Sequence, residues 1–93
     1  MHQSPPDLGL VQVLLDELQK HTLPRTLDLK EKVDRGEPLD EFEQTFLEQA
    51  LDLATRFDTL TEHHVEYQAL AARVSHLYHE ITAKALQNAS QHS

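Results

Sequence analysis

The sequence predicts an all-α protein, folded as a small antiparallel bundle of three helices. Leucine dominates the apolar residues and glycine occurs at only two positions, which favours helices over a turn-rich β fold. Apolar residues also recur with helical spacing in three separate stretches. At 93 residues the chain is long enough for one domain with a modest core. We expect a single helical domain over residues 1–93, with short disordered tails at about 1–7 and 89–93.

The first helix is expected from about Leu8 to His21, and Pro24 interrupts it. Proline has no backbone N–H, and its ring clashes with the carbonyl group four residues earlier. The helix should therefore be kinked or broken at Pro24, with Thr22 capping a second piece that ends near Asp34. The bundle then has three helices, or four if the interruption is complete. The inward faces of the two pieces comprise Leu8, Val11, Leu14, Leu15, Leu18, Thr22, Leu23, Leu27, Leu29 and Val33.

A reversal of the chain is predicted between Arg35 and Pro38. Gly36 can adopt the left-handed conformation that ends a helix, and Pro38 prevents the helix from continuing. Asp40 is then expected to cap the next helix. Glu43, three residues later, completes a variant of the capping box, in which each side chain accepts a hydrogen bond from the backbone N–H of the other residue.

The predicted helix between Leu39 and Leu60 carries an unusually wide apolar face. On a helical wheel two apolar rows cover about half of the circumference, against roughly 100° for a simple surface helix. A helix with such a face must pack against two neighbours. One row contains Phe42, Phe46, Ala50, Leu53, Phe57 and Leu60, and the other contains Leu47, Leu51 and Ala54.

A final helix is expected from about Val65 to Asn88, after a connection at Thr59–His64. Its apolar residues follow the spacing of a single buried face. We expect Phe46 of the preceding helix and Leu77 of the final helix to be core residues. The apolar face of the final helix comprises Tyr67, Leu70, Ala71, Val74, Leu77, Tyr78, Ile81 and Ala85.

Negative charge is concentrated in the central helix. The chain has a net charge of −8, and residues 37–62 contribute −7 of it through eight carboxylates and one base, Arg56. Such a surface repels the phosphate backbone, so no nucleic-acid partner is expected. The charge leaves an alternative function open, that of an acidic nucleic-acid mimic that inhibits a basic target protein. Pairing of these carboxylates with Lys30, Lys32 or Arg35 would weaken that alternative.

The chain lacks the motifs of a catalytic site. It has no cysteine and no glycine-rich phosphate loop, and no Glu is followed three residues later by His. We therefore expect no enzymatic activity, no catalytic residue and no cofactor. Of the seven histidines, His63 and His64 precede the final helix, and His76 and His79 lie one turn apart on its polar side. Metal ligands need a supporting shell that excludes water, and histidines on a polar side are expected to be solvated. A histidine-based metal-binding module is therefore only the third hypothesis, and no metal ligand is assigned.

The remaining apolar residues suggest a contact surface. Leu10 and Val13 lie outside the main stripe of the first helix, and Leu51 lies at the edge of the central helix. On one common surface, these side chains would form a patch for a protein partner or a weak homodimer. The leading hypothesis is a non-catalytic protein–protein interaction or regulatory module. Since no signal peptide and no apolar stretch of membrane length is recognisable, we expect a cytoplasmic protein without a membrane partner.

Overall fold

The computed structural model describes residues 8–91, and 88% of these residues are helical with no strand among them. The predicted all-α class is therefore confirmed. The described elements are α1 (Leu8–Glu17), the π-helical turn η1 (Leu18–Thr22), α2 (Leu23–Asp34), α3 (Glu41–Leu60) and α4 (Val65–Gln91).

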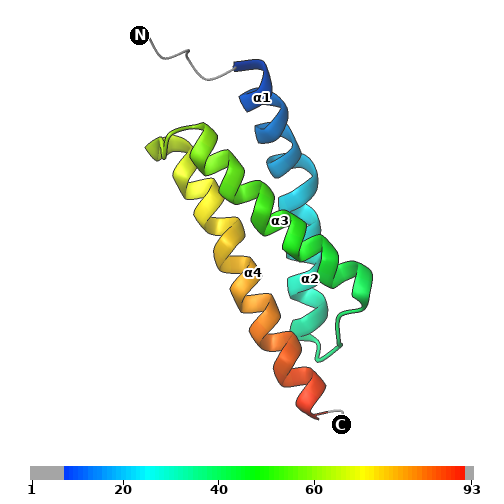
Figure 1. Ribbon diagram of the computed structural model, residues 1–93. Coiled ribbons are helices and arrows are strands. Elements are labelled where there is room, and N and C mark those ends of the chain that lie inside the picture. Colours follow the sequence, from blue (N-terminus) through cyan, green and yellow to red (C-terminus); the bar gives the residue numbers. More distant parts are fainter. Residues whose placement is uncertain (1–7, 92–93) are drawn as a thin grey trace.

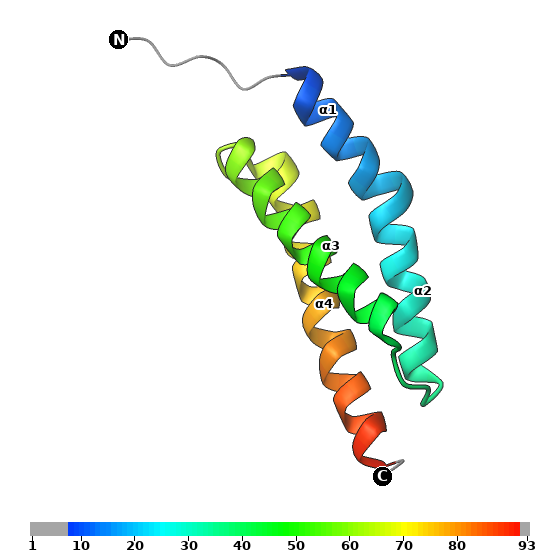
Figure 2. The same cartoon turned by 45° about the vertical axis from the view of Figure 1, so that its right-hand side comes forward.

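These elements form an elongated antiparallel bundle with extents of 58 × 21 × 20 Å. The segments α1, η1 and α2 follow one another as a single rod, α3 returns in the opposite direction, and α4 reverses again (Figures 1 and 2). α3 and α4 pack along each other, α2 packs mainly on α4, and α1 packs on α3. The rod therefore crosses the α3–α4 hairpin, so that its two halves face different helices.

Pro24 interrupts the rod through a widened turn and not through a break. The backbone N–H of Leu23 donates to the carbonyl of Leu18, five residues earlier, which is the bond of a π-helix. This wider turn gives the ring of Pro24 space that a regular α-helix would deny it. The expected cap at Thr22 is wrong: its backbone is helical and its side chain makes no capping hydrogen bond. Because the turn widens, Thr22 stays inside the helix, where its carbonyl accepts a hydrogen bond from Thr26 Oγ1 at 2.7 Å.

The core consists of two clusters of buried side chains, one toward each end of the bundle. We call the end that holds α1 and the turn at residues 61–64 the α1 end, and the end that holds the loop at residues 35–40 and the last turns of α4 the Asn88 end. The cluster toward the α1 end contains Val11, Leu18, Ala50, Ala54, Phe57, Ala71 and Val74. The cluster toward the Asn88 end contains Leu29, Val33, Leu47, Leu77 and Ile81.

The wide apolar face of α3 is only partly covered. Successive residues four apart advance by about 40° around a helix, so a row with that spacing drifts away from the core. Ala50 is buried, Phe46 is half-buried beneath the guanidinium of Arg25 at 5.0 Å from the ring centroid, and Phe42 is 83% exposed. The expected inward position of Phe42 is therefore wrong, whereas Leu77 on α4 is a core residue as predicted.

The helix α4 continues to Gln91, beyond the predicted end at Asn88. Residues 89–91, which were expected to belong to a disordered tail, lie in its last turn. Asn88 itself is buried, so this part of α4 belongs to the packed bundle. The expected tails at 1–7 and 92–93 lie outside the described residues.

The reversal after α2 is a Schellman motif, as the position of Gly36 predicted. The N–H of Gly36 donates to the carbonyl of Val33 at 3.0 Å, and the N–H of Glu37 donates to that of Lys32 at 3.3 Å. Gly36 has a φ of 90°, in the left-handed region that glycine adopts without a steric penalty. The predicted capping box follows, with Asp40 and Glu43 bonded reciprocally.

The reversal after α3 uses the same hydrogen bonds without a glycine. The N–H of Glu62 donates to the carbonyl of Thr59 at 3.0 Å, and the N–H of His63 donates to that of Asp58 at 2.9 Å. Glu62 and His63 have φ values of 56° and 58°. A left-handed conformation costs a residue with a side chain roughly 1–2 kcal/mol, so this turn is more strained than the turn at Gly36.

Candidate functional site

An apolar groove lies between α1 and α3 at the α1 end. Its volume is about 480 Å³. Leu10 and Leu14 of α1 form one wall, and Leu53 and Leu60 of α3 form the other. Thr55, Arg56 and Thr59 add polar groups on the α3 side. We call this opening the α1–α3 groove.

The groove exists because α1 is covered by fewer neighbours than α2. Among the described helices, the backbone of α1 lies close to that of α3 and continues into η1, but it does not come close to the backbone of α4. Leu14, Leu53 and Leu60 are therefore only half-buried, although each belongs to an apolar stripe. Burying the apolar surface that these side chains still expose would be favourable by about 25 cal/mol per Å².

The predicted contact residues are only partly brought together. Leu10 is 45% exposed and lines the groove, and Val13, three residues further along α1, is 63% exposed and lies outside the lining. Leu51 is half-buried and lies about 160° around α3 from Leu53, because two residues advance a helix by about 200°. Leu51 therefore does not line the groove, whereas Leu10 and Val13 lie on α1 beside it.

The sequence interpretation missed Leu14, Leu53 and Leu60 as site residues because it assigned them to the core. The signal that could have identified them is the width of the apolar face of α3. A face that covers about half of a helix needs two complete neighbours. Since α1 covers only part of that face, the surplus apolar surface becomes the wall of the groove.

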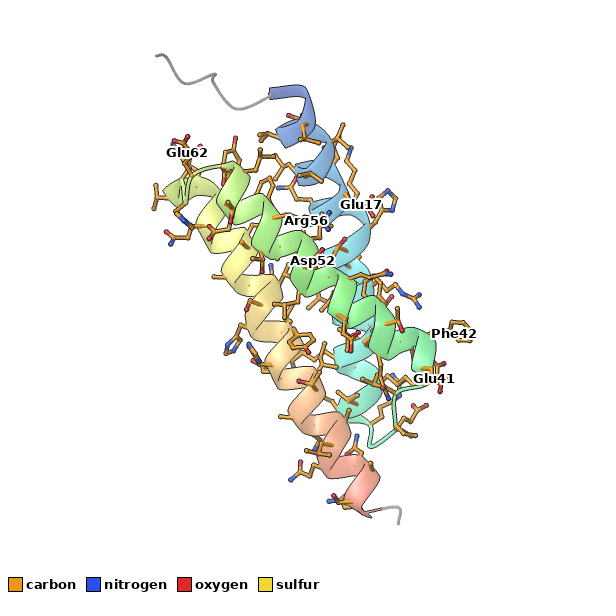
Figure 3. All side chains as sticks on the ribbon, viewed as in Figure 1. Glu17, Glu41, Phe42, Asp52, Arg56 and Glu62 are labelled. Carbon is orange, nitrogen blue, oxygen red and sulfur yellow. The ribbon has the colours of Figure 1, made fainter. Side chains whose placement is uncertain are left out.

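The line along which the rod of α1, η1 and α2 meets α3 is called the seam. Along this seam the groove continues into a more polar opening of about 370 Å³. The two openings share Leu53 and Arg56, and the second is also lined by Glu17 and Asp52. Arg56 Nη2 lies 3.0 Å from Asp52 Oδ2, with both side chains largely exposed. Figure 3 shows Glu17, Asp52 and Arg56 on the same face of the molecule. The seam is thus apolar toward the α1 end and carries two carboxylates and one guanidinium further along.

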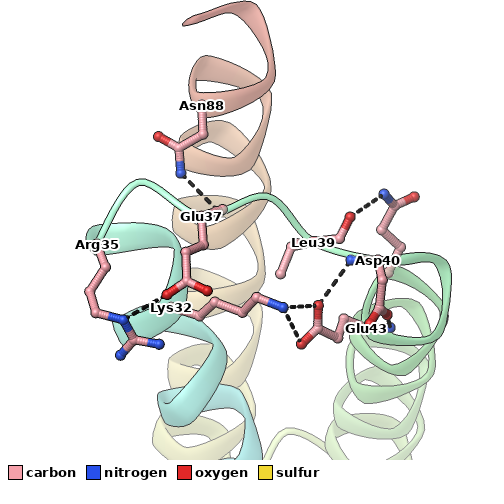
Figure 4. A network of polar contacts seen from close by, with 8 residues as sticks. Lys32, Arg35, Glu37, Leu39, Asp40, Glu43 and Asn88 are labelled. Atoms are coloured by element: carbon pink, nitrogen blue, oxygen red, sulfur yellow. Dashed lines mark hydrogen bonds and ion pairs between the residues drawn. The ribbon is translucent and has the colours of Figure 1, made fainter. Parts of the chain in front are cut away.

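The densest polar network of the described residues lies at the opposite end (Figure 4). Lys32 Nζ lies 2.7 Å from Glu43 Oε1, and the same oxygen accepts the backbone N–H of Asp40 at 2.9 Å. The side-chain amide of Asn88 donates to the carbonyls of Val33 at 2.8 Å and Glu37 at 3.1 Å. These bonds join α2, the following loop, α3 and α4. Each group is engaged by another part of the chain, so the network holds the helices together.

Two lysines near this network have shifted proton affinities. The hydrogen bond from Lys32 to Glu43 raises the pKa of that lysine above its ordinary value of 10.5. The hydrogen bond from Lys30 to Asp34, at 2.7 Å, likewise raises the pKa of Lys30. Both shifts favour the charged ammonium form, as expected for lysines beside carboxylates. Neither lysine is thereby adapted to act as a base near neutral pH.

The carboxylates of residues 37–62 do not form one free surface. Glu37 pairs with Arg35, Glu43 with Lys32, and Asp52 with Arg56. The Asp40 side chain caps α3. The remaining engaged carboxylate, Asp58 Oδ2, lies 2.7 Å from Nδ1 of His63. Glu41, Glu48 and Glu62 are exposed.

This distribution weakens the hypothesis of a nucleic-acid mimic. A mimic needs a continuous array of free carboxylates, and internal pairing with basic residues removes charge from such an array. Pairing with Lys32 and Arg35 is the outcome that would count against it.

The histidines within residues 8–91 are spread over the surface. His76 Nε2 lies 2.6 Å from Glu80 Oε1, and His63 pairs with Asp58. Within residues 8–91 no three or more side chains of histidine, aspartate or glutamate are placed to hold a metal ion together. In the same part of the chain, none of the helices combines the length and apolar character needed to cross a membrane.

Comparison with models of protein families, with curated proteins and with solved structures finds no match for this chain.

Proposed function

We propose that this protein is a non-catalytic binding module that holds a helix of a partner protein in the α1–α3 groove. The observation that carries the proposal is the apolar groove itself, which lies beside the exposed residues Leu10 and Val13. Grooves between two helices commonly receive the apolar face of a third helix. A partner helix would bury Leu10, Leu14, Leu53 and Leu60, whose packing within this chain is incomplete.

The contrast with the Asn88 end supports this assignment. At that end, Asn88 and Lys32 bond to neighbouring segments, so polar side chains are used to close the bundle. At the α1 end, the apolar walls of the groove stay open. The absence of cysteine agrees with our expectation of a cytoplasmic module, where disulfides are rare.

A double substitution on α1 tests the proposal. Leu10→Ser with Val13→Ser removes apolar contact area, while the exposure of both side chains leaves the fold intact. Leu86→Ser is the matched control, because Leu86 is 71% exposed near the far end of α4. The tagged wild-type protein and both variants are used for affinity purification from the native source, with quantitative mass spectrometry.

The proposal predicts a partner that the wild type and the Leu86→Ser variant retain and that the double variant loses. Far-UV circular dichroism should show the same helical content in all three proteins. If the three proteins recover the same set of partners in the same amounts, the groove is not the binding site.

A further inference from the structure

We propose that the partner helix is basic, with Lys or Arg about one turn beyond a short row of apolar residues. This inference rests on the proposed function and adds the chemistry of the partner. It follows from the two neighbouring openings along the seam between the rod and α3. The lining of this seam changes from apolar to acidic within a few helical turns.

The length of the seam fits a helix of several turns. The two openings extend along α3 from Leu60 to Phe46, which corresponds to roughly 20 Å at 1.5 Å per residue. Leu60 and Leu53 are two turns apart, so apolar residues at i, i+3 or i+4, and i+7 of a partner helix would span the same distance. The apolar half therefore sets the spacing of the apolar residues in the partner.

The secondary structure of the protein favours a helical occupant over an extended one. An extended peptide gains affinity mainly when its backbone pairs with the edge of a β-sheet. Residues 8–91 contain no strand, so the groove offers side chains and not a row of backbone groups. A helix satisfies its own backbone hydrogen bonds and needs only side-chain contacts from its receptor.

The polar half of the seam determines the charge of the occupant. Glu17 is exposed on α1, and Asp52 keeps much of its carboxylate surface exposed although it pairs with Arg56. A carboxylate accepts several hydrogen bonds, so Asp52 can bind a second cation beside Arg56. A Lys or Arg about one turn beyond the apolar row of the partner would lie in the opening that both carboxylates line.

The charge of the whole chain supports the same choice. A net charge of −8 attracts a basic partner over a long range and repels a second copy of the protein. Complementary charge raises the association rate and selects against acidic competitors. A basic amphipathic helix thus combines the apolar contact and the charge that this seam can accept.

The test is a selection from a phage-displayed library of amphipathic helices of about 18 residues, a length that covers the seam. The library varies both the apolar spacing and the charge, and phages that bind the Leu10→Ser, Val13→Ser variant are removed. The inference predicts that the enriched peptides carry apolar residues at helical spacing, with Lys or Arg about one turn beyond one end of the apolar row. Synthetic peptides of the enriched sequences are then titrated against the wild-type protein.

Charge variants identify the acidic residues that bind. Glu17→Gln together with Asp52→Asn should weaken binding of the enriched peptide about three- to tenfold and reduce its salt dependence. Glu48→Gln is the matched control, because Glu48 is an exposed acid that lines an opening between α3 and α4 instead. This control should leave the Kd unchanged.

The outcomes separate this inference from the proposed function. Enriched peptides without Lys or Arg, or a Kd that is insensitive to the Glu17 and Asp52 substitutions, would overturn the basic partner and leave the groove as a binding site. If no peptide is enriched, both proposals are overturned. Self-association in sedimentation equilibrium that the Leu10→Ser, Val13→Ser variant loses would identify a second copy as the occupant and also overturn the basic partner.

Discussion

The two ends of the bundle reverse the chain with the same backbone hydrogen bonds but complete the fold differently. At the Asn88 end, the left-handed position is Gly36, and Asn88 bonds across to the end of α2 and to the loop. At the α1 end, the equivalent position is Glu62. Outside the rod formed by α1, η1 and α2, the backbone of α1 lies close to that of α3 and not to that of α4. One end is held together by cross-links between segments, and the other retains strain and the apolar α1–α3 groove.

This difference shows how a short chain can combine a stable fold with an adaptable surface. The fold needs one region in which every helix is held by its neighbours, and the Asn88 end supplies it. Regions with fewer packed neighbours open more easily and are the usual location of binding surfaces. The following predictions compare the two ends, from the largest expected effect to the smallest.

The largest expected difference is between core substitutions at the two ends. Ile81→Ala removes a fully buried side chain at the Asn88 end and should lower the free energy of unfolding by roughly 2–5 kcal/mol. Leu14→Ala removes a half-buried side chain of the groove and should cost less than about 1.5 kcal/mol, since its burial is incomplete. Urea denaturation followed by circular dichroism measures both values, and equal costs would contradict the comparison.

Asn88→Ala should be the next most destabilising change. It leaves the carbonyls of Val33 and Glu37 without the amide donor that they now share. Loss of a buried partner of this kind costs about 1–3 kcal/mol in the free energy of unfolding. Gln87→Ala, at an exposed neighbouring position, is the control and should have a small effect. A similar small effect for Asn88→Ala would show that its two hydrogen bonds contribute little.

Substitutions at the two left-handed positions should change stability in opposite directions. Apart from Gly36 itself and the residues next to it, no atom lies within 4 Å of a Cβ added at Gly36. The cost of Gly36→Ala, roughly 1–2 kcal/mol, therefore comes from its left-handed backbone conformation alone. Glu62→Gly removes the corresponding penalty at the other reversal and should stabilise the protein by about 0.5–1 kcal/mol. Thermal unfolding of the two variants checks the signs, and destabilisation by Glu62→Gly would refute the strain that we assign to that turn.

The smallest expected effect is a pH dependence at the Asn88 end. The folded protein holds the proton of Lys32 more tightly than the unfolded chain, whose lysine pKa is near 10.5. The associated stabilisation is complete below that pH and is lost as the pH rises through the higher pKa of the folded state. The Glu43→Gln variant keeps a capping side chain but lacks the charge, so its Tm should fall less between about pH 10 and pH 12 than that of the wild type. Identical slopes would show that the pair does not contribute.

The sequence predicted the features that depend on neighbouring residues. Gly36 ends α2 and Asp40 with Glu43 begins α3, because both motifs act within a few residues. Asn88 could not be predicted as a cross-link, since its acceptors lie more than fifty positions away in the chain. The absence of a cap at Thr22 could not be predicted from the sequence either, because a helix can accommodate a proline by widening one turn.

The candidate site was only partly predictable for a related reason. Periodicity placed Leu10 and Val13 outside the main stripe of α1, and both are exposed. The same periodicity assigned Leu53 to the core, although it forms the wall of the groove. The sequence pattern gives the direction of each side chain from its own helix. How far the neighbouring helix covers it depends on the crossing of the rod and the hairpin, which no local pattern encodes.

Native-state hydrogen exchange, measured residue by residue with NMR, tests the central contrast between the two ends most directly. We predict that amides in α1, such as that of Leu14, open with a lower free energy than amides near Ile81 in α4, because α1 is held by fewer packed neighbours. The amides near Ile81 should exchange only through global unfolding. Equal protection of α1 and of the Ile81 region would contradict the account, because the α1 end would then be as firmly closed as the Asn88 end.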